Sequence, residues 1–206
     1  ADKIQRVAGI IEDTKKNSEL AIVVSAFGGV TDMIKTISES AAAGKDTDSI
    51  FDSLVTKHTE YAEALFKINE EVIRNRLDEY FKQLKSDILF VAKEKHLSSQ
   101  SLDKVLSYGE LISATVIAEY LSQIGIAAEQ LDARKVILTD DQFGHAFVHY
   151  QRSYDRIRHY IQDRNKIQVI TGFLGETETG TTTTLGRSGS DYTAAIFGAA
   201  LNAQVI

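Results

Sequence analysis

Short runs of apolar, β-branched residues recur along the chain, followed by loops of small residues and alternating with helical patterns. Residues 20–24, Leu-Ala-Ile-Val-Val, lead into a loop at 25–31, and residues 167–170, Ile-Gln-Val-Ile, lead into a loop at 171–175. Such runs are typical of strands in a parallel sheet, so we expect the first to be buried on both faces. Strands that alternate with helices predict an α/β domain with a mainly parallel sheet.

Further helices and strands are expected on the same grounds. Helical spacing predicts helices at residues 4–11, from about 31, and at 46–95, 111–124, 154–161 and 192–202. Further strands are expected at residues 126–131, 136–139, 146–148, 181–185 and 204–206. The mixed-charge stretch 46–95, whose apolar positions include Ile68, predicts a helical subdomain over residues 46–106. The helix 111–124 is almost wholly apolar, as central helices are, and Gly125 is well placed to end it.

The composition is that of a soluble globular chain of one domain or two small ones, with 206 residues of which 43% are hydrophobic and 25% charged. The absence of cysteine excludes disulfides and Cys-based metal or redox sites. A net charge of −6 disfavours a nucleic-acid partner. No apolar run reaches the ~18 residues of a membrane-spanning helix, so no membrane partner is expected. The five histidines form no metal-binding pattern, and no metal site is expected from them.

Four loops at strand ends or helix starts are candidates for the chemistry, because ligands of open α/β sheets bind beyond the carboxyl ends of the strands. In the first loop, Ser25, Gly28 and Gly29 follow a strand, the glycine pair allows a ligand to approach the backbone closely, and the helix N-terminus that follows favours an anion. The same pair fits a tight turn that needs positive φ. It is not a Walker A loop, whose sequence occurs nowhere in the chain.

The second and third loops each allow two interpretations. Glu110 ends the loop 107–110 and heads the apolar helix. Its carboxylate would accept from a substrate ammonium, or it is a first-turn acid that complements the helix dipole. The glycines of the loop 171–175 allow main-chain contact with a ligand, although such a loop is often only a turn.

The fourth loop, within residues 181–193, is the most informative. Arg187 offers a planar fork suited to a carboxylate or a phosphate. Ser190 is a candidate N-cap, and Asp191 lies in the first turn of the next helix. Together they predict an anion site in which Asp191 needs a lysine or Mg²⁺ as partner when phosphate binds. The alternative is a capped helix with a surface arginine. A serine-hydrolase elbow and a dinucleotide-binding glycine motif are both absent.

These loops resemble motifs of the aspartokinase family, in the family's order and across essentially the whole chain. Three of them are residues 24–32 (Val-Ser-Ala-Phe-Gly-Gly-Val-Thr-Asp), 106–110 (Leu-Ser-Tyr-Gly-Glu) and 170–175 (Ile-Thr-Gly-Phe-Leu-Gly). Residues 182–195, Thr-Thr-Thr-Leu-Gly-Arg-Ser-Gly-Ser-Asp-Tyr-Thr-Ala-Ala, carry the most specific resemblance. The segments 131–134, Leu-Asp-Ala-Arg, and 139–144, Thr-Asp-Asp-Gln-Phe-Gly, are similar to the family as well.

The resemblance implies a three-layer amino acid kinase fold with a mainly parallel central sheet, and transfer of the ATP γ-phosphate to the β-carboxylate of L-aspartate with Mg²⁺. By this resemblance, the reaction would begin the synthesis of lysine, threonine and methionine, and we expect a cytoplasmic enzyme that is a homo-oligomer when full length. By position, Thr31, Glu110, Arg187 and Ser190 would contact aspartate, Asp191 would orient the catalytic lysine, and Ser25, Gly28 and Gly29 would lie beside the phosphates.

The resemblance also implies an incomplete domain. The family begins with a strand and a Lys-Phe-Gly-Gly-Thr loop whose lysine binds phosphate, and it continues into a Thr-Asp-Val-Asp-Gly segment and regulatory ACT domains. None of these occurs in residues 1–206, so we expect a partial kinase domain that is inactive alone. The long helical stretch resembles the bifunctional type fused to homoserine dehydrogenase. The alternatives are another amino acid kinase with a different carboxylate or carbamate substrate, and a non-catalytic binding module of the same fold.

Overall fold

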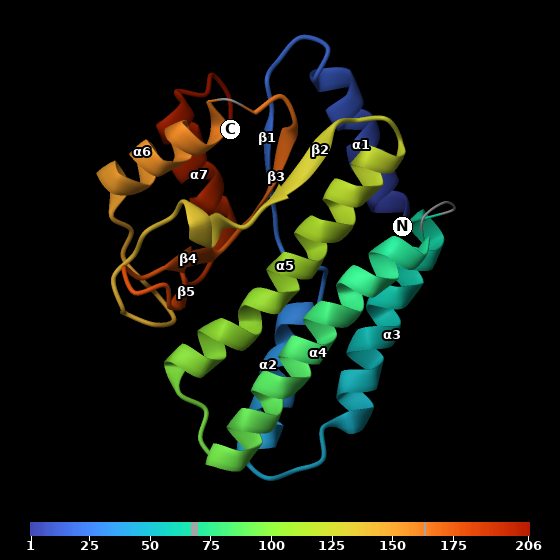
Figure 1. Cartoon of the computed structure of the whole chain (residues 1–206), viewed down its shortest axis with the longest axis vertical. Coiled ribbons are helices and arrows are strands. Elements are labelled where there is room, and N and C mark those ends of the chain that lie inside the picture. Colours follow the sequence, from blue (N-terminus) through green and yellow to red (C-terminus); the bar gives the residue numbers. More distant parts are fainter. Residues whose placement is uncertain (67–69, 163) are drawn as a thin grey trace.

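Three parallel strands form the centre of the molecule. The computed structural model describes residues 1–66, 70–162 and 164–206, so Ile68 lies outside the described residues. Strands β1 (Ala21–Val24), β2 (Ala128–Leu131) and β3 (Ile167–Thr171) pair in the order β1-β3-β2 (Figure 1). Val24 lies opposite Thr171 in the register, and Leu131 lies opposite Ile170. The three carboxyl ends therefore meet at one edge of the sheet.

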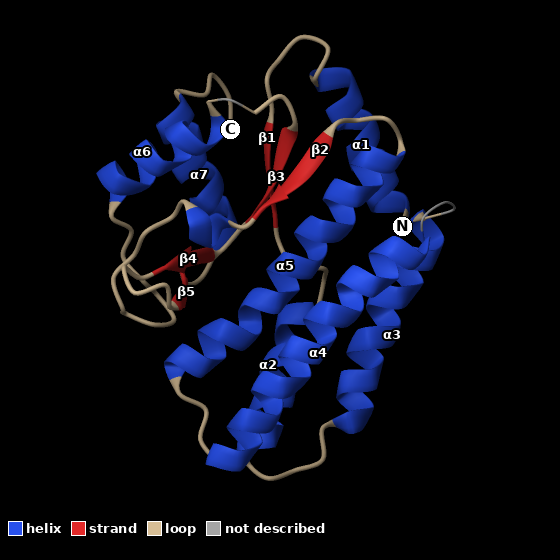
Figure 2. Cartoon of the chain, viewed as in Figure 1, coloured by secondary structure: helices blue, strands red, loops and turns tan. Residues whose placement is uncertain are grey.

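Helices cover both sides of this sheet, as expected for an α/β fold. Helix α5 (Ser99–Gln123) packs against β2 and β3, and α7 (Gly189–Leu201) packs against β1. Helix α6 (Tyr150–Ile161) packs against α7 (Figure 2). Helix α1 (Asp2–Thr14) precedes β1. Gly125, with φ +85°, follows the end of α5 and confirms the expected stop.

The lower half of the molecule in Figure 1 is helical. It contains α2 (Val30–Ala42), α3 (Asp48–Leu65), α4 (Glu70–Glu94) and the first turns of α5, and α2 packs against both α4 and α5. The helical expectation for residues 46–95 is confirmed within the described residues. The limits proposed for a separate subdomain stay a prediction, and residue 106 lies inside α5, so one helix joins the two halves.

A small antiparallel ribbon follows the central strand. It consists of β4 (Leu174–Glu176) and β5 (Thr182–Thr184). The segments predicted as strands at 136–139 and 146–148 instead follow a 3₁₀ turn, η1 (Ala133–Lys135), and form isolated bridges, Leu138 with Glu176 and Thr139 with Val148. Each bridge is a single residue pair, because the chain turns again before a ladder extends.

Two strand predictions differ from the structure in burial or in kind. Strand β1 is half-buried rather than buried on both faces, because it pairs on one side only, with β3. The buried central strand is β3, whose last four residues are all buried. Residues 204–206 form no strand. The chain turns at Asn202, with φ +51°, and Ala203 N–H donates to Gly198 O at 2.9 Å, which directs the end along α7.

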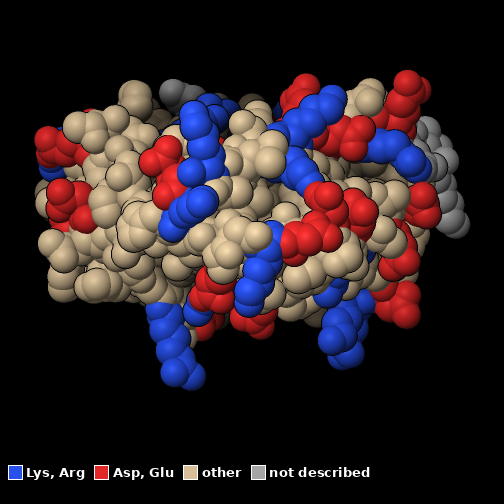
Figure 3. All heavy atoms as spheres, turned by 90° about the horizontal axis from the view of Figure 1, so that it is seen from below, with Lys and Arg blue, Asp and Glu red and all other residues tan. Residues whose placement is uncertain are grey.

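Charges of both signs are mixed over the end of the molecule formed by the helical half. Figure 3 views the molecule from below and shows Lys and Arg interspersed with Asp and Glu, so neither sign dominates that face. Among the helices of the described residues, none combines the length and apolarity needed to cross a membrane.

Candidate functional site

The loop after β1 is held by a turn that needs glycine at one position. Val30 N–H donates to Phe27 O at 2.9 Å, and Gly29, with φ +79°, is the N-cap residue of α2. An L side chain at Gly29 would be strained in this left-handed conformation. Ser25 and Gly28 are exposed, and Thr31 is exposed in the first turn of α2. The loop therefore presents accessible main chain at the start of a helix, which is the arrangement that favours a bound anion.

Glu110 occupies a different place from the one predicted. It lies in the middle of α5, not at its start, because Ser98 caps this helix by accepting from Ser101 N–H at 3.0 Å. It therefore complements no helix dipole. The Glu110 carboxylate is only 4% exposed and accepts a hydrogen bond from the main-chain N–H of Ala26. Its Oε2 has no partner in the described part of the chain.

Among the described residues, a second buried carboxylate on α5 has hydrogen-bond partners for both of its oxygens, which Glu110 does not have. Asp103 is also buried, but its Oδ2 accepts from the N–H groups of Gly144 and Thr184, both at 2.9 Å, and its Oδ1 accepts from Thr184 Oγ1 at 2.8 Å. Burial raises the pKa of Asp103, and these hydrogen bonds oppose the shift. Burial raises the pKa of Glu110 to about 7, opposed by one main-chain hydrogen bond. Asp103 thus has structural partners, whereas Glu110 has a free acceptor atom.

The end of β3 lies directly beside the end of β1 and the start of α7. Gly172 N–H donates to Val24 O at 2.8 Å, and Phe173 N–H donates to Thr193 Oγ1 at 2.9 Å. A Cβ on Gly172 would lie 2.6 Å from Ser190 Cβ and 2.9 Å from its Cα. Ser190 is not the N-cap, because Ser188, with φ +58°, takes that position. Ser190 is half-buried in the first turn, where its hydroxyl faces the Gly172 main chain.

This close approach gives a stability prediction. Gly172→Ala is expected to destabilise the fold by about 1–3 kcal/mol, because the new methyl overpacks against the Ser190 backbone. The free energy of urea unfolding measures the effect. Gly9→Ala is the matched control, since Gly9 lies in α1 with nothing within 4 Å of an added Cβ, and it should stabilise by about 0.5–1 kcal/mol. Equal stability of Gly172→Ala and the unmodified chain would contradict the packing.

Arg187 and Asp191 flank the start of α7. Arg187 is exposed in a turn closed by the hydrogen bond from Gly189 N–H to Gly186 O, 3.0 Å, and none of the described carboxylates forms an ion pair with it. Asp191 is exposed in the first turn. No hydrogen bond within the described ranges joins Thr31, Arg187 or Asp191 to Glu110. What unites them is a common position beyond the carboxyl ends of β1 and β3.

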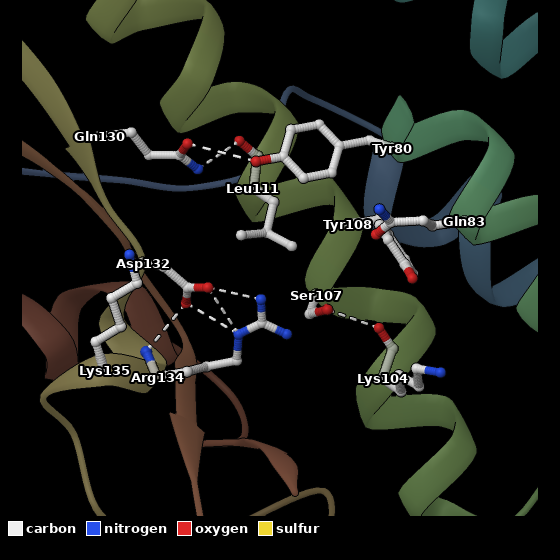
Figure 4. A pocket seen from close by; sticks show the side chains of 10 residues that line it. All are labelled: Tyr80, Gln83, Lys104, Ser107, Tyr108, Leu111, Gln130, Asp132, Arg134 and Lys135. Carbon is white, nitrogen blue, oxygen red and sulfur yellow. Dashed lines mark hydrogen bonds and ion pairs between the residues drawn. The ribbon is translucent and has the colours of Figure 1, made fainter. Parts of the chain in front are cut away.

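A cavity lies on another flank of α5, beside α4 and β2. It measures about 190 Å³ and is lined by α4, α5, β2 and the η1 turn (Figure 4). In it, the Arg134 guanidinium forms a bidentate pair with Asp132, with Nη2 and Oδ2 at 2.6 Å, and Nη1 donates to Thr182 Oγ1 at 2.9 Å. The pair ties the end of β2 to β5, and so supports the segment that leads to Arg187.

Sequence patterns missed several side chains that shape the site. Asp103 and Arg134 hold β5, and Lys57 of α3 donates to Gly28 O at 2.6 Å. The signal available for Arg134 was its place directly after a strand, two residues from Asp132. Asp103 and Lys57 carried no signal, because their partners lie 81 and 29 residues away.

Mg²⁺ and the phosphates of ATP require different groups, carboxylates for the metal ion and main-chain donors for the phosphates. The exposed main chain at Gly28 and the N-terminus of α2 fit a phosphate. The described residues contain no group of three or more His, Asp or Glu side chains placed to hold a metal ion. Mg²⁺ in kinases needs only one or two carboxylates together with the substrate phosphates, and Asp191 offers one.

Comparison with known proteins shows the family of the chain. The model of the amino acid kinase family matches residues 1–206, and the chain belongs to that family. It is 33% identical over 199 residues to an aspartokinase of Chlamydia muridarum, covering 96% of this chain and 42% of the relative. The structure of Escherichia coli aspartokinase III in complex with aspartate and ADP aligns with a TM-score of 0.87 at 28% identity, covering 98% of this chain and 44% of that one.

Relatives of both kinds, with and without a second enzyme, are similar to the chain. A bifunctional aspartokinase/homoserine dehydrogenase of Arabidopsis thaliana is 29% identical over 205 residues, covering 97% of this chain and 22% of the relative. The chain thus spans less than half the length of each of these relatives. The likeness does not separate the bifunctional type from the others.

Proposed function

We propose that the chain forms part of an aspartate kinase, which transfers the γ-phosphoryl group of ATP to the β-carboxylate of L-aspartate. The observation that carries this proposal is the buried Glu110, whose free Oε2 lies beside an anion-binding loop. A buried acceptor without a partner costs stability, so its retention is explained by a ligand that supplies a donor. The ammonium group of aspartate is such a donor.

The remaining residues fit the same substrate. Arg187 binds the α-carboxylate through its fork, and Ser190 and Thr31 add hydroxyl donors. Together with Glu110 they hold aspartate with its β-carboxylate turned towards the loop at Ser25, Gly28 and Gly29. That orientation distinguishes the reacting carboxylate from the one bound to the arginine.

The transfer itself is a displacement at phosphorus. An oxygen of the β-carboxylate attacks the γ-phosphorus as the bond to the β–γ bridging oxygen breaks, giving 4-phospho-L-aspartate and ADP. Main-chain N–H groups at Gly28, Gly29 and the α2 N-terminus stabilise the phosphate charge. Asp191 orients a lysine or shares Mg²⁺, which when bound neutralises charge on the phosphates. The chain acts mainly by positioning and charge stabilisation.

The proposed activity also implies a pathway, a location and an oligomeric state. The product would feed lysine, threonine and methionine synthesis in the cytoplasm, and the enzyme would act as a homo-oligomer. The amino acid kinase fold also suits other carboxylates and carbamates, and a fold of this kind can bind without catalysis. The hydroxamate assay distinguishes these alternatives from aspartate kinase activity.

The test measures acyl-phosphate formation as the hydroxamate, in the protein as its gene encodes it. We expect ATP-dependent product with L-aspartate, and kcat/KM lower by at least about tenfold with L-glutamate, which is one methylene longer. A preference for glutamate or a carbamate would overturn the substrate, and a protein that binds both ligands without turnover would overturn catalysis. The 206-residue chain alone should form no hydroxamate.

A further inference from the structure

The loop that would hold the phosphates packs on α3 through an aromatic residue. The Phe27 ring lies 5.7 Å from the His58 ring and 4.9 Å from the Tyr61 ring, measured between centroids. Loops at strand ends usually gain their order from such packing and are mobile without it. Helix α3 therefore supports the loop through these ring contacts.

Lys57 holds the same loop by its main chain. Its Nζ donates to Gly28 O at 2.6 Å, and it lies 3.6 Å from the position of a Cβ on Gly29. The ammonium thus contacts Gly28 and lies close to Gly29, next to the N-terminus of α2. A carbonyl turned towards Lys57 cannot turn towards a bound phosphate, which would repel it.

His58 of α3 is held in one orientation beside the Phe27 ring of the loop. It is fully buried, and its Nδ1 lies 2.7 Å from Leu54 O, an acceptor, so Nδ1 carries the proton. Its Nε2 is then a bare acceptor with no partner within the described residues. The ring also contacts Phe81 of α4 at 5.6 Å, edge to face. His58 is thus wedged between the loop and α4 in one orientation.

These contacts extend to Glu110. The loop that contacts Lys57 and His58 also carries the Ala26 N–H that Glu110 accepts from. Gly109, beside Glu110, packs so closely on the loop that an added Cβ would lie 3.0 Å from Ala26 Cβ. A change in the loop therefore moves the surroundings of the ammonium-binding carboxylate as well as the phosphate-binding main chain.

We propose that α3 clamps the loop 25–29 in its ligand-binding conformation, with Lys57 and His58 as positioning residues. This inference rests on the proposed function, because that function makes the loop a ligand site. Neither residue lies in a motif that the sequence singled out, and both belong to the helical half rather than to the sheet. The clamp gives this half a role in substrate binding.

The first test is hydrogen–deuterium exchange on the 206-residue chain. Lys57→Met should raise exchange at the amides of residues 26–30 by about tenfold, the scale of one lost charge-assisted hydrogen bond, without change in α7. Lys57→Arg should restore protection, since the fork can still donate. Lys45→Met, at an exposed lysine between α2 and α3, is the matched control. Unchanged exchange in both Lys57→Met and His58→Phe would overturn the clamp.

The second test uses the protein as its gene encodes it. Lys57→Met should raise the KM values for aspartate and ATP by about tenfold and change kcat by less than about threefold, since the contact acts on loop position. Raised exchange with unchanged KM would overturn the positioning role. An unmodified protein without phosphoryl transfer would instead refute the proposed function, while the exchange result would still decide whether the clamp exists.

Discussion

Arg187→Ala is expected to weaken L-aspartate binding by about 10- to 100-fold, the loss that follows when a hydrogen bond to a charged group is removed. Arg187 is exposed and is not held by any described carboxylate, so its removal should leave the fold intact. The loss should appear in the KM for aspartate and not in the free energy of unfolding. Calorimetric titration of aspartate and a urea unfolding curve measure the two quantities separately.

Two companion variants make this result specific. Arg187→Lys keeps the charge but loses the fork, and should recover only part of the affinity. Arg6→Ala removes an exposed arginine from α1, far along the chain from the site, and should change nothing. An unchanged KM in Arg187→Ala would remove this residue from the substrate site.

Glu110→Gln is expected to flatten the pH dependence of stability. The pKa of Glu110 is about 7 in the fold against 4.5 ordinarily, so the folded state binds more protons between these values. Its contribution is therefore most favourable below about pH 4.5 and falls by roughly 3 kcal/mol as pH rises to 7 and above. Urea unfolding at several pH values should show this fall in the unmodified chain and in the control Glu60→Gln, but not in Glu110→Gln.

The same carboxylate should release a proton when aspartate binds. The ammonium of the ligand favours ionised Glu110, so near pH 7 about half a proton should leave for each aspartate bound. Calorimetry in buffers with different ionisation enthalpies measures this number. Glu110→Gln should abolish the release and weaken binding by about 100-fold, the cost of leaving a ligand ammonium without its ionic partner. Binding without proton release in the unmodified chain would show that Glu110 does not face the ammonium.

Periodicity and strand composition predicted the elements that form the frame. The runs around Val23 and Ile170 are neighbouring parallel strands, and Gly125 ends the helix before β2. Burial of β1 was not predictable, because composition does not show which strand lies at an edge. The start of α5 was placed at residue 111, where the almost wholly apolar stretch begins, although the helix begins at Ser99. Gly109 is an interior glycine of this helix, required by the close approach of Ala26.

The site was predictable in its loops and not in its supports. A glycine pair after a strand and an arginine before a helix can be recognised in the sequence. In the structure, the loops that carry them lie at one edge of the sheet. The role of Ser190 as a cap was wrong, because a φ of +58° at Ser188 starts the helix two residues earlier. A long-range contact such as the hydrogen bond from Arg134 to Thr182 has no signature in the sequence, because the two residues lie 48 positions apart.

Helix α5 runs across the candidate site and fixes the distance between two of its buried carboxylates. Asp103, which accepts from Thr184 of β5, and Glu110, which we propose faces the substrate ammonium, lie seven residues apart, so about 10 Å of rigid helix separates them on one face. A helix does not stretch, and this spacing stays fixed as substrates change. A longer amino acid therefore has to be accommodated by the Gly186–Gly189 turn or by the clamped loop. We therefore expect discrimination by substrate length to depend on the backbone of α5, and mutations that relax it should map to the Gly186–Gly189 turn or to the loop 25–29.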